Sequence, residues 1–561
     1  MWGWIQLTHS DEQRRSAKVS AGAPEPLKRR KAGGLLRSSA IFSGLTLISR
    51  FMGLARDLVI TARLGASATV AADAYNTALA FPNLFRRIFA EGAFAAAFVP
   101  AYSRTLTGEG AETADKLASD ALATLAAATL ILTVAAQLAM PWLMYVINPG
   151  YAADPAKFKL AVVLTQISMP YLPCMAITAL LSGVLNARDR FILSGGAPIL
   201  LNLGMLIAVL PQHDSIRAAY AASWGIVGAG VAQAALLWWG ARKSKANIVL
   251  RLPRLTPEIR ALIGLAIPGA IAASATQINI FVSGVLASQV AGARSWLAVA
   301  DRLYQLPLGL VGVAIGVALL PRLSQALQAG DHDDAQTATD QAIVYALALT
   351  LPAAAALTAM PFFLIDALFT RGEFNTIDAH ATAAALFHYG WGVPAFVLTR
   401  VLSPVFFARQ DTKGPMRFAL ISVAVNIVLG ILLFRVIGFQ GIAAATAVAS
   451  WINVVQMVMA LSRKGDYRPS KAAWGKIVRV LIASMALGAL LGTASHFREH
   501  IEAVVRSKEV AVLLVSAVGG ALYPFLLFAT GGVTLTEIKT LLRRRRAADL
   551  PPVTDAGNAQ P

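Results

Sequence analysis

Long apolar runs, separated by short polar connections, fill the chain between about residues 38 and 530. A helix needs about 20 mostly apolar residues to cross a bilayer. Because the runs reach that length, the pattern predicts an all-α polytopic membrane protein with about fourteen transmembrane helices. The predicted spans lie near 38–64, 74–100, 118–147, 158–186, 191–211, 217–240, 257–290, 295–321, 340–366, 379–408, 415–437, 439–461, 474–495 and 509–530.

Polar, strongly basic tails flank these runs. Residues 1–36 end in a Lys-Arg-Arg-Lys run, and residues 533–561 contain four consecutive arginines. The first apolar run carries charged residues, unlike the core of a cleavable signal peptide. With the N-terminus in the cytoplasm and an even number of spans, about two thirds of the 49 Lys and Arg fall on the cytoplasmic side. The sequence therefore predicts two cytoplasmic tails, the first of them disordered.

Two pairs of similar segments indicate an internal repeat. V-L-N-A-R-D at 184–189 resembles V-F-F-A-R-Q at 405–410, and F-V-P-A-Y-S at 98–103 resembles L-L-P-R-L-S at 319–324, at the same spacing. The spacing maps spans one to six onto spans seven to twelve in parallel and leaves two C-terminal helices outside the repeat. Coincidence among Ala- and Leu-rich helices is the alternative. The predicted domains are a tail at 1–36, six-helix lobes at 37–243 and 244–465, two extra helices at 466–532 and a tail at 533–561.

The composition excludes several classes of protein. Of 561 residues, 57% are hydrophobic and only 14% are charged, with a mean hydropathy of +0.61. Soluble proteins carry about 25% charged residues, so a soluble enzyme is excluded. The single cysteine, Cys174, excludes a disulfide scaffold. The net charge of +19 lies in tails and connections without a nucleic-acid-binding motif, and we predict no nucleic-acid partner. Catalytic motifs such as G-x-S-x-G and H-E-x-x-H are absent from the sequence.

Charged residues inside the apolar runs gather in three predicted spans. An ionised side chain at mid-membrane costs about 2.5–3.5 kcal/mol, so such residues usually face a bundle interior or a watery cavity. Arg87 and Glu91 are four residues apart and can pair. Arg56 has no acid three or four positions away, and we expect the adjacent Asp57 to point elsewhere. The charged residues of these three spans are Arg50, Arg56, Asp57, Asp73, Arg86, Arg87, Glu91, Asp301 and Arg302, and Arg400 lies in another span.

Two interpretations of these charges remain open from the residues alone. They could form interhelical salt bridges that fix the packing. They could also line a polar cavity with an excess of arginine, suited to an anionic ligand such as a lipid-borne phosphate or pyrophosphate, because the planar guanidinium binds phosphate through two donors. A coupled transporter also uses mixed charges, so charge alone does not define the substrate.

The strings that hold these charges carry a family resemblance. S-R-F-M-G-L-A-R-D at 49–57, F-P-N-L-F-R-R-I-F-A-E-G-A-F at 81–94 and A-D-R-L-Y-Q-L-P-L-G at 300–309 closely resemble the MurJ (MviN) family. The resemblance runs from about 37 to 530. It implies a lipid II flippase of the bacterial inner membrane, in the multidrug/oligosaccharidyl-lipid/polysaccharide exporter superfamily. The implied fold has two six-helix lobes and two extra helices that form a groove for the polyprenyl tail.

The resemblance also implies a substrate-binding set. We expect Arg56 and Arg302, one from each lobe, to be the main pyrophosphate contacts. Arg50 and Arg86 would enlarge the positive field, and the acids would orient the arginines or bridge the lobes. Arg87 is outside the set because Glu91 can neutralise it. The implied substrate-binding residues are Arg50, Arg56, Asp57, Asp73, Arg86, Glu91, Asp301 and Arg302.

Coupling and partners complete the expectations. Some family members bind sodium with carboxylates of spans seven and eleven, but here those spans offer Gln277, Asn279 and Asn426. We therefore expect no metal and no cofactor, which leaves membrane potential or proton coupling through Glu91 or Asp73. The expected partners are lipid II (the undecaprenyl-pyrophosphate-linked disaccharide peptide), membrane lipid and cell-wall synthesis proteins, with the chain itself a monomer. The alternatives are export of another lipid-linked glycan, a drug/cation antiporter on the same fold, a membrane-embedded glycosyltransferase or phosphatase, and a structural scaffold.

Overall fold

The computed structural model describes residues 32–85, 87, 94–318, 325–326, 329–330, 332–407 and 409–533. Within these ranges the chain is α-helical and forms no β-strand, so the predicted all-α class is confirmed. The helices are α2 (Ala32–Leu64), α3 (Ala71–Phe85), α4 (Phe94–Gly108), α5 (Ala111–Ile147), η3 (Pro149–Ala153), α6 (Pro155–Ser168), α7 (Tyr171–Ala187), α8 (Phe191–Val209), α9 (Ser215–Lys243), α10 (Pro257–Ala287), α11 (Ala293–Ala318), α13 (His332–Ala359), α14 (Pro361–Phe369), α15 (Thr376–Gly390), α16 (Val393–Phe407), α17 (Lys413–Ile437), α18 (Gln440–Arg463), α19 (Lys471–His496), α20 (Arg498–Val505) and α21 (Lys508–Ala529).

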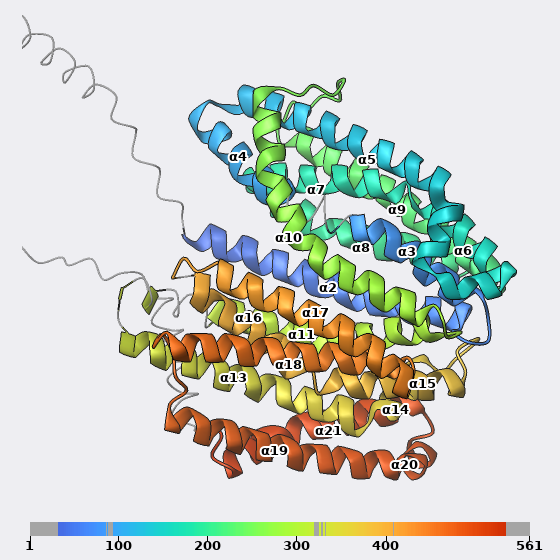
Figure 1. Ribbon diagram of the computed structural model, residues 1–561, viewed down its shortest axis with the longest axis vertical. Helices are drawn as coiled ribbons and strands as arrows, with labels where there is room; N and C mark the ends of the chain where they lie inside the picture. The colour runs from blue at the N-terminus through green and yellow to red at the C-terminus, as the bar shows by residue number, and fades with distance from the viewer. Residues whose placement is uncertain are drawn as a thin grey trace, which may run out of the picture.

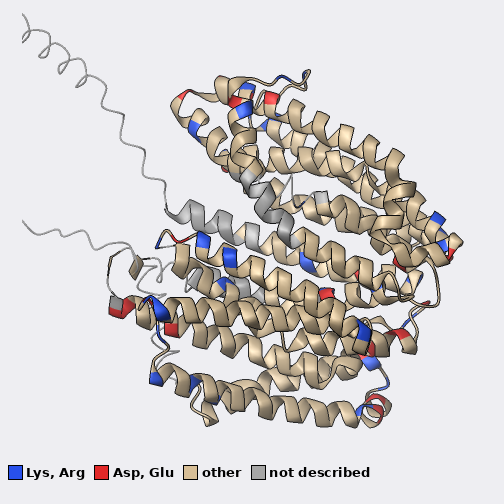
Figure 2. Cartoon of the chain, viewed as in Figure 1, with Lys and Arg blue, Asp and Glu red and all other residues tan. Residues whose placement is uncertain are grey.

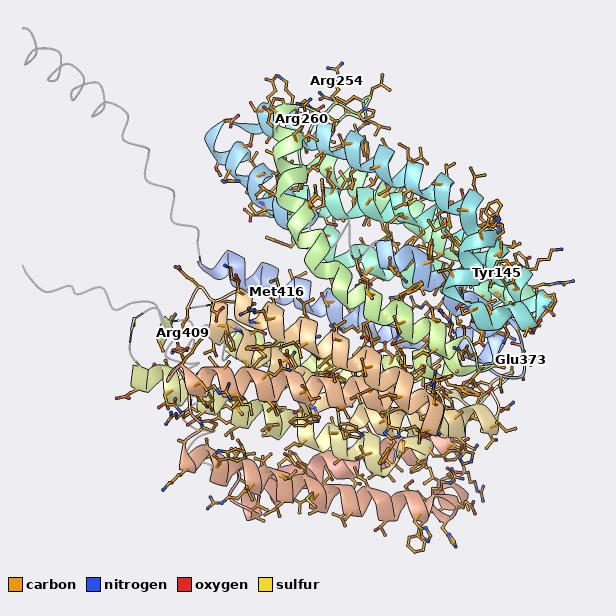
Figure 3. The ribbon with its side chains drawn as sticks, viewed as in Figure 1. Tyr145, Arg254, Arg260, Glu373, Arg409 and Met416 are labelled. Atoms are coloured by element: carbon orange, nitrogen blue, oxygen red, sulfur yellow. The ribbon has the colours of Figure 1, made fainter. Side chains whose placement is uncertain are left out.

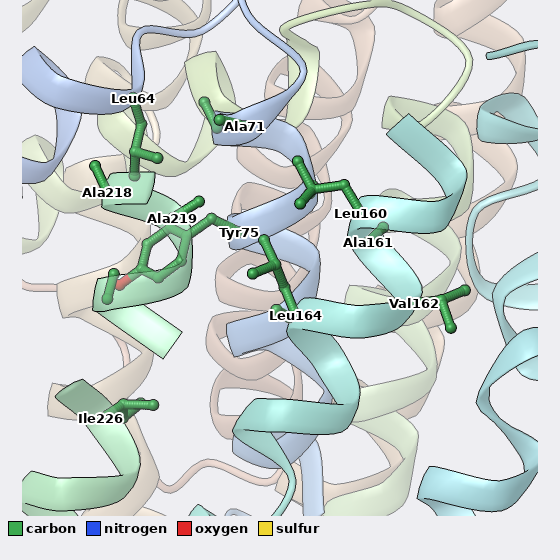
Figure 4. Packing of buried hydrophobic residues seen from close by; sticks show 14 of the residues in the cluster. Leu64, Ala71, Tyr75, Leu160, Ala161, Val162, Leu164, Ala218, Ala219 and Ile226 are labelled. Atoms are coloured by element: carbon green, nitrogen blue, oxygen red, sulfur yellow. The ribbon is translucent and has the colours of Figure 1, made fainter. Parts of the chain in front are cut away.

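The helices form two bundles that lie beside each other (Figure 1). We call α2–α9 the N-terminal lobe and α11–α18 the C-terminal lobe. One core of the N-terminal lobe packs Tyr75 of α3 and Leu164 of α6 against Ala219 of α9 (Figure 4). α10 joins the lobes, because Ile259 at its start lies in an N-terminal core and Ala287 at its end lies in a C-terminal one.

The last helices lie outside the two lobes. α19 and α21 pack on the C-terminal lobe through a core that includes Phe363 of α14, Leu487 of α19 and Tyr523 of α21. The Tyr523 hydroxyl donates a hydrogen bond of 2.8 Å to the Ala348 carbonyl on α13. This arrangement agrees with two extra helices appended to the repeat.

Ten helices in the described ranges are long and apolar enough to cross a membrane. They coincide with ten of the fourteen predicted spans, and the count of fourteen stays a prediction. The other four predicted spans fall on α2, α3 with α4, α10 and α11. Of these, α2 and α11 carry the charges at Arg56, Asp57, Asp301 and Arg302. In both helices the charged residues of the candidate site interrupt the apolar sequence.

Matching turns support the internal repeat. Asp189 after α7 and Gln410 after α16 both have φ of 60°, an uncommon value for residues with a side chain. Just before them, Arg188 donates to the Ser244 carbonyl beyond α9, and Arg409 donates to the Asp466 carbonyl beyond α18, both at 3.1 Å. These shared contacts favour a true repeat over coincidence for this pair of segments. The segment at 319–324 and both tails lie outside the described residues.

Charged residues gather toward the two ends of the helices and are sparse along their middles (Figure 2). Figure 3 places Arg254, Arg260 and Arg409 at one end, and Tyr145 and Glu373 at the other. We call the first the basic end and the second the clasp end, for the contacts described below. α5 runs from the basic end to the clasp end, where Tyr145 lies near its last turn.

Candidate functional site

Three predicted site residues meet between the lobes. On α2, Arg56 forms an ion pair of 2.6 Å with Asp57. Arg302 of α11 reaches the other oxygen of Asp57 at 2.5 Å. Asn202 of α8 accepts a hydrogen bond of 3.0 Å from Arg56. One carboxylate therefore holds two guanidinium groups from different lobes, and we call these residues the Asp57 node.

The expectation that Asp57 points away from Arg56 is wrong. The Arg56 side chain folds back so that both Nε and Nη2 reach Oδ1 of Asp57, at 2.9 and 2.6 Å. Helical spacing places the Cβ atoms of adjacent residues in different directions, but it does not limit where a long guanidinium ends. Asn202 occupies a remaining donor and fixes this orientation.

The node borders a cavity of about 80 Å³. Tyr75, Asn76 and Ser295 add polar groups to its lining, and Leu79, Val299 and Phe369 add apolar ones. A cavity of this size admits a few water molecules. A ligand larger than a few waters needs more room than this cavity offers.

Exposure and charge define what the node can do. The side chains of Arg56 and Asp57 are 11% and 19% exposed, whereas Arg302 is 47% exposed. Two arginines share one carboxylate, which leaves one net positive charge in an apolar bundle. Arginine in that setting favours an anion with several oxygen acceptors, such as a phosphate.

Arg50 and Asp301 lie on the same two helices but are not part of the node. Arg50 packs against α11 at Gly309, where a Cβ would lie only 1.6 Å from its Nη1 atom. Asp301 accepts a hydrogen bond from Gln305 on its own helix. Neither residue lines the 80 Å³ cavity. Arg86 and Glu91 lie outside the described residues, so their predicted roles stay predictions.

Asp73 lies at the clasp end, away from the node. It is 1% exposed and pairs with Lys157 of α6 at 3.2 Å. It also accepts hydrogen bonds from the C-terminal lobe, from the Gly292 amide at 2.8 Å and from the Ser295 hydroxyl at 3.0 Å. Asp73 therefore fastens the lobes together instead of lining the cavity.

A second buried carboxylate makes the reverse connection. Asp378 of α15 accepts hydrogen bonds from the Ser67 amide at 3.0 Å and the Ser67 hydroxyl at 2.5 Å in the N-terminal lobe. Trp296 donates to the same oxygen at 2.9 Å. Each lobe thus offers one carboxylate to donors of the other. We call Asp73, Asp378 and these donors the clasp.

Sequence reasoning missed several polar residues that complete the node and the clasp. Asn202 is a polar residue in an otherwise apolar span, and this signal could have been used. Asp378 sits in an Asn-x-x-Asp capping box with Asn375, which explains it locally and hides its contact across the lobes. The others are Ser67, Lys157 and Ser295, whose sequence contexts give no such signal.

An apolar groove lies where the C-terminal lobe meets α19. It has a volume of about 500 Å³ and lies between α13, α15, α16, α18 and α19. Leu351, Phe387, Trp391, Trp451 and Met485 line it. Of the two extra helices, α19 lines this groove, and the predicted groove formed by both helices stays a prediction.

The chain matches known proteins over most of its length. The family model "Lipid II flippase MurJ" matches residues 60–506. The "Probable lipid II flippase MurJ" of Rhizobium tropici is 40% identical over 530 residues, covering 93% of this chain and 98% of the relative. The "Lipid II flippase MurJ" of Burkholderia cenocepacia is 32% identical over 464 residues, covering 82% and 89%.

Solved structures give the same fold. A structure named "Lipid II flippase MurJ, inward closed conformation" superposes with a TM-score of 0.70 at 23% identity, covering 87% of this chain and 98% of that one. An inward-facing multidrug resistance MATE family transporter of the MOP superfamily gives 0.61 at 15% identity, covering 76% and 98%. Both similarities support the fold alone.

Proposed function

This chain belongs to the MurJ family of lipid II flippases, and from that premise we propose that it moves lipid II across the bacterial inner membrane by alternating access, with Arg56 and Arg302 binding the pyrophosphate. It is a transporter and not an enzyme. The observation that carries the proposal is that the two arginines, from different lobes, converge on Asp57. Export of another substrate on the same fold is not favoured by the comparisons.

Asp57 takes the position of the substrate anion between transport events. An unpaired charge buried in an apolar bundle costs several kcal/mol, so two arginines need a carboxylate there when no phosphate is bound. When the lobes separate, the Arg302–Asp57 pair breaks and one guanidinium becomes free. The pyrophosphate then replaces Asp57 as the group that joins the two arginines, through paired N–H···O contacts.

The clasp supports closure of one face during this cycle. α2 begins at the basic end and reaches the clasp end at Leu64, where Ser67 follows. If the N-terminus is cytoplasmic, as the Lys and Arg distribution predicts, the clasp closes the periplasmic face. The head group then enters from the cytoplasm, and breaking the clasp releases it outside.

The apolar groove accommodates the polyprenyl tail. Its lining by Phe387, Trp391, Trp451 and Met485 offers only weak polar contacts, which suits a hydrocarbon chain. Because α13 and α16 belong to the C-terminal lobe and α19 to the extra helices, the tail stays outside the inter-lobe cavity while the head group crosses. This division keeps the tail in an apolar environment throughout.

The function is tested in cells depleted of this protein and resupplied with wild type, Arg56→Ala or the exposed control Arg254→Ala. We expect lipid II on the outer face of the inner membrane to fall on depletion, and to return with wild type and Arg254→Ala but not with Arg56→Ala. Membrane fractionation verifies equal insertion. Recovery with Arg56→Ala would remove the node from the mechanism. Unchanged exposure on depletion, in cells without a second flippase, would exclude lipid II as the substrate.

A further inference from the structure

A second pocket lies at the basic end of the N-terminal lobe, separate from the Asp57 node. It has a volume of about 370 Å³ and is formed where α7 ends, α8 begins and α9 ends, by residues 189–193 and by Trp239, Gly240, Lys243 and Ser244. Gly240 allows α8 and α9 to approach there, because a Cβ at Gly240 would lie 2.4 Å from Cδ1 of Leu193. The pocket is therefore built into the corner between two packed helices.

Two cations line this pocket. Arg190 and Lys243 are both exposed, and within the described ranges neither forms an ion pair with a carboxylate. Asp189 is the acid in the lining, so the pocket has a net positive charge. α8 begins at Phe191 without a side-chain cap, and its first N–H groups add to the positive field. The corner thus combines two side-chain cations with a helix N-terminus.

At the matching corner of the C-terminal lobe, the position of Arg190 is taken by a residue of opposite charge, Asp411. Asp411 follows Gln410 there, as Arg190 follows Asp189, and both preceding residues have φ of 60°. Asp411 pairs with Lys464 at the end of α18 at 2.6 Å, and accepts a hydrogen bond of 2.8 Å from the Gly414 amide in the first turn of α17. In this lobe the chain itself supplies the anion.

In the N-terminal lobe, Arg190 takes the position of Asp411, so the chain supplies a cation there instead of an anion. Two like charges facing one pocket repel each other, and an external anion between them removes the repulsion. Apolar side chains at the corner identify the source of that anion. Ile192 is 58% exposed and Trp239 is 53% exposed, and Lys243 lies 4.8 Å from the Trp239 ring centroid. Tryptophan beside Lys or Arg is typical of the membrane–water interface.

We propose that this pocket binds the phosphate of an anionic membrane phospholipid. Arg190, Lys243 and the first turn of α8 contact the phosphate, and the acyl chains run along Ile192 and Trp239. The site does not depend on lipid II transport, because it shares no residue with the Asp57 node or the groove.

The test titrates phosphatidylglycerol into the purified, delipidated full-length protein and counts bound lipid by native mass spectrometry. Arg190→Asp copies the Asp411–Lys464 pair of the other lobe, and we expect it to weaken one binding step at least tenfold, since each surface cation contributes about fivefold. Lys243→Gln is expected to weaken the same step about fivefold. Asp411→Arg is expected to add one binding step, and Arg254→Asp serves as the charge-matched control that leaves binding unchanged.

Three results would overturn the proposal. Equal binding by Arg190→Asp and Arg254→Asp, with both folded by thermal melting, would place the lipid elsewhere. Equally tight binding of phosphatidylcholine would remove the role of charge. Displacement of phosphatidylglycerol by an equal concentration of inorganic phosphate would identify the ligand as a free anion instead of a lipid. If Arg190→Asp fails to fold, the same titration is made with Lys243→Gln, and unchanged binding of phosphatidylglycerol by that variant would overturn the proposal.

Discussion

The two halves of the repeat each contain a side-chain hydrogen bond to an asparagine at a matching place. The partner of the asparagine is a charged arginine in the first half and a neutral asparagine in the second. In the N-terminal lobe, Asn202 of α8 accepts a hydrogen bond of 3.0 Å from Arg56 of α2. In the C-terminal lobe, Asn426 of α17 donates one of 2.9 Å to Asn279 of α10. In each half of the repeat the link joins the first predicted span to the fifth, α2 to α8 in one half and the connecting helix α10 to α17 in the other. The C-terminal link, which also includes Thr446, is neutral.

The difference between the charged and the neutral hydrogen bond shows how one repeated fold provides helix packing in one half and a contact between lobes in the other. A neutral amide pair in a membrane contributes modest packing energy and needs no counter-charge. Arg56 in the same kind of place requires Asp57, and Asp57 in turn draws Arg302 from the other lobe. The repeat therefore supplies the frame, and one charged substitution in that frame creates the contact between lobes.

The largest expected effect on transport comes from removing the charge of Arg56. Arg56→Ala leaves Asp57 with one partner and the substrate without half of its site, at a cost of about 3 kcal/mol. We expect the rate of lipid II flipping in proteoliposomes to fall about a hundredfold or more. Asn279→Ala, its neutral counterpart, is expected to change the rate less than twofold. Similar losses for both variants would contradict the comparison.

The clasp gives the next largest effect. Asp73→Asn and Asp378→Asn each weaken charge-assisted hydrogen bonds between lobes, which are worth about 1.5–3 kcal/mol each. We expect either change to raise the labelling rate of a cysteine placed at the buried Ala66 about tenfold, in a Cys174→Ser background. An unchanged rate in both variants would show that the clasp does not hold the lobes together.

Gly309→Ala tests whether transport depends on the position of the Arg50 side chain, and we expect a smaller effect than for Arg56→Ala. The added Cβ would overlap the Arg50 guanidinium and force it away from α11. We expect the flipping rate to fall about tenfold, the loss of roughly one charged contact, with little loss of thermal stability. The control is Gly264→Ala, where nothing lies within 4 Å of the added Cβ. A normal rate for Gly309→Ala would show that the position of Arg50 is unimportant.

Much of the fold follows from the sequence. The bilayer core offers no water to backbone N–H and C=O groups, so a spanning segment must be a long apolar helix that satisfies its own backbone hydrogen bonds. The three charged spans, and the position of Arg56 and Arg302 in different lobes, were also within reach, whereas their predicted role as pyrophosphate contacts stays a prediction. The contacts of Asp57, Asn202 and Asp378 were not. They depend on the reach of long side chains and on how the lobes approach each other, and neither leaves a periodic signal.

A matched pair of asparagine variants separates stability from transport. Asn202→Ala and Asn426→Ala each remove one side-chain hydrogen bond, and we expect each to cost about 1 kcal/mol of unfolding free energy in detergent. Only Asn202→Ala is expected to lower the apparent affinity for lipid II, about fivefold, because Asn202 orients Arg56. An equal affinity change in both would mean that the asparagines act through packing alone.

The smallest expected effect concerns the Asp411–Lys464 pair. The hydrogen bond from Lys464 lowers the pKa of Asp411, so the pair stabilises the fold above the ordinary aspartate range near 4 and is lost as the pH falls below it. Asp411→Asn is expected to cost about 0.5 kcal/mol at pH 7, since exposed ion pairs contribute little. Thermal melting between pH 7 and pH 2 should show the difference shrink as the pH falls below 4 and through the lowered pKa of Asp411, and a constant difference would contradict it.

Asp57 also bears on whether transport is one-way or an exchange. A carrier whose lobes can come together only around a ligand must carry something on its return and so performs exchange. Here a residue of the chain joins Arg56 and Arg302, so the two lobes can meet without cargo. The return step then needs no counter-substrate. Net accumulation on the far side then becomes available, and consumption of the delivered molecule can set its direction.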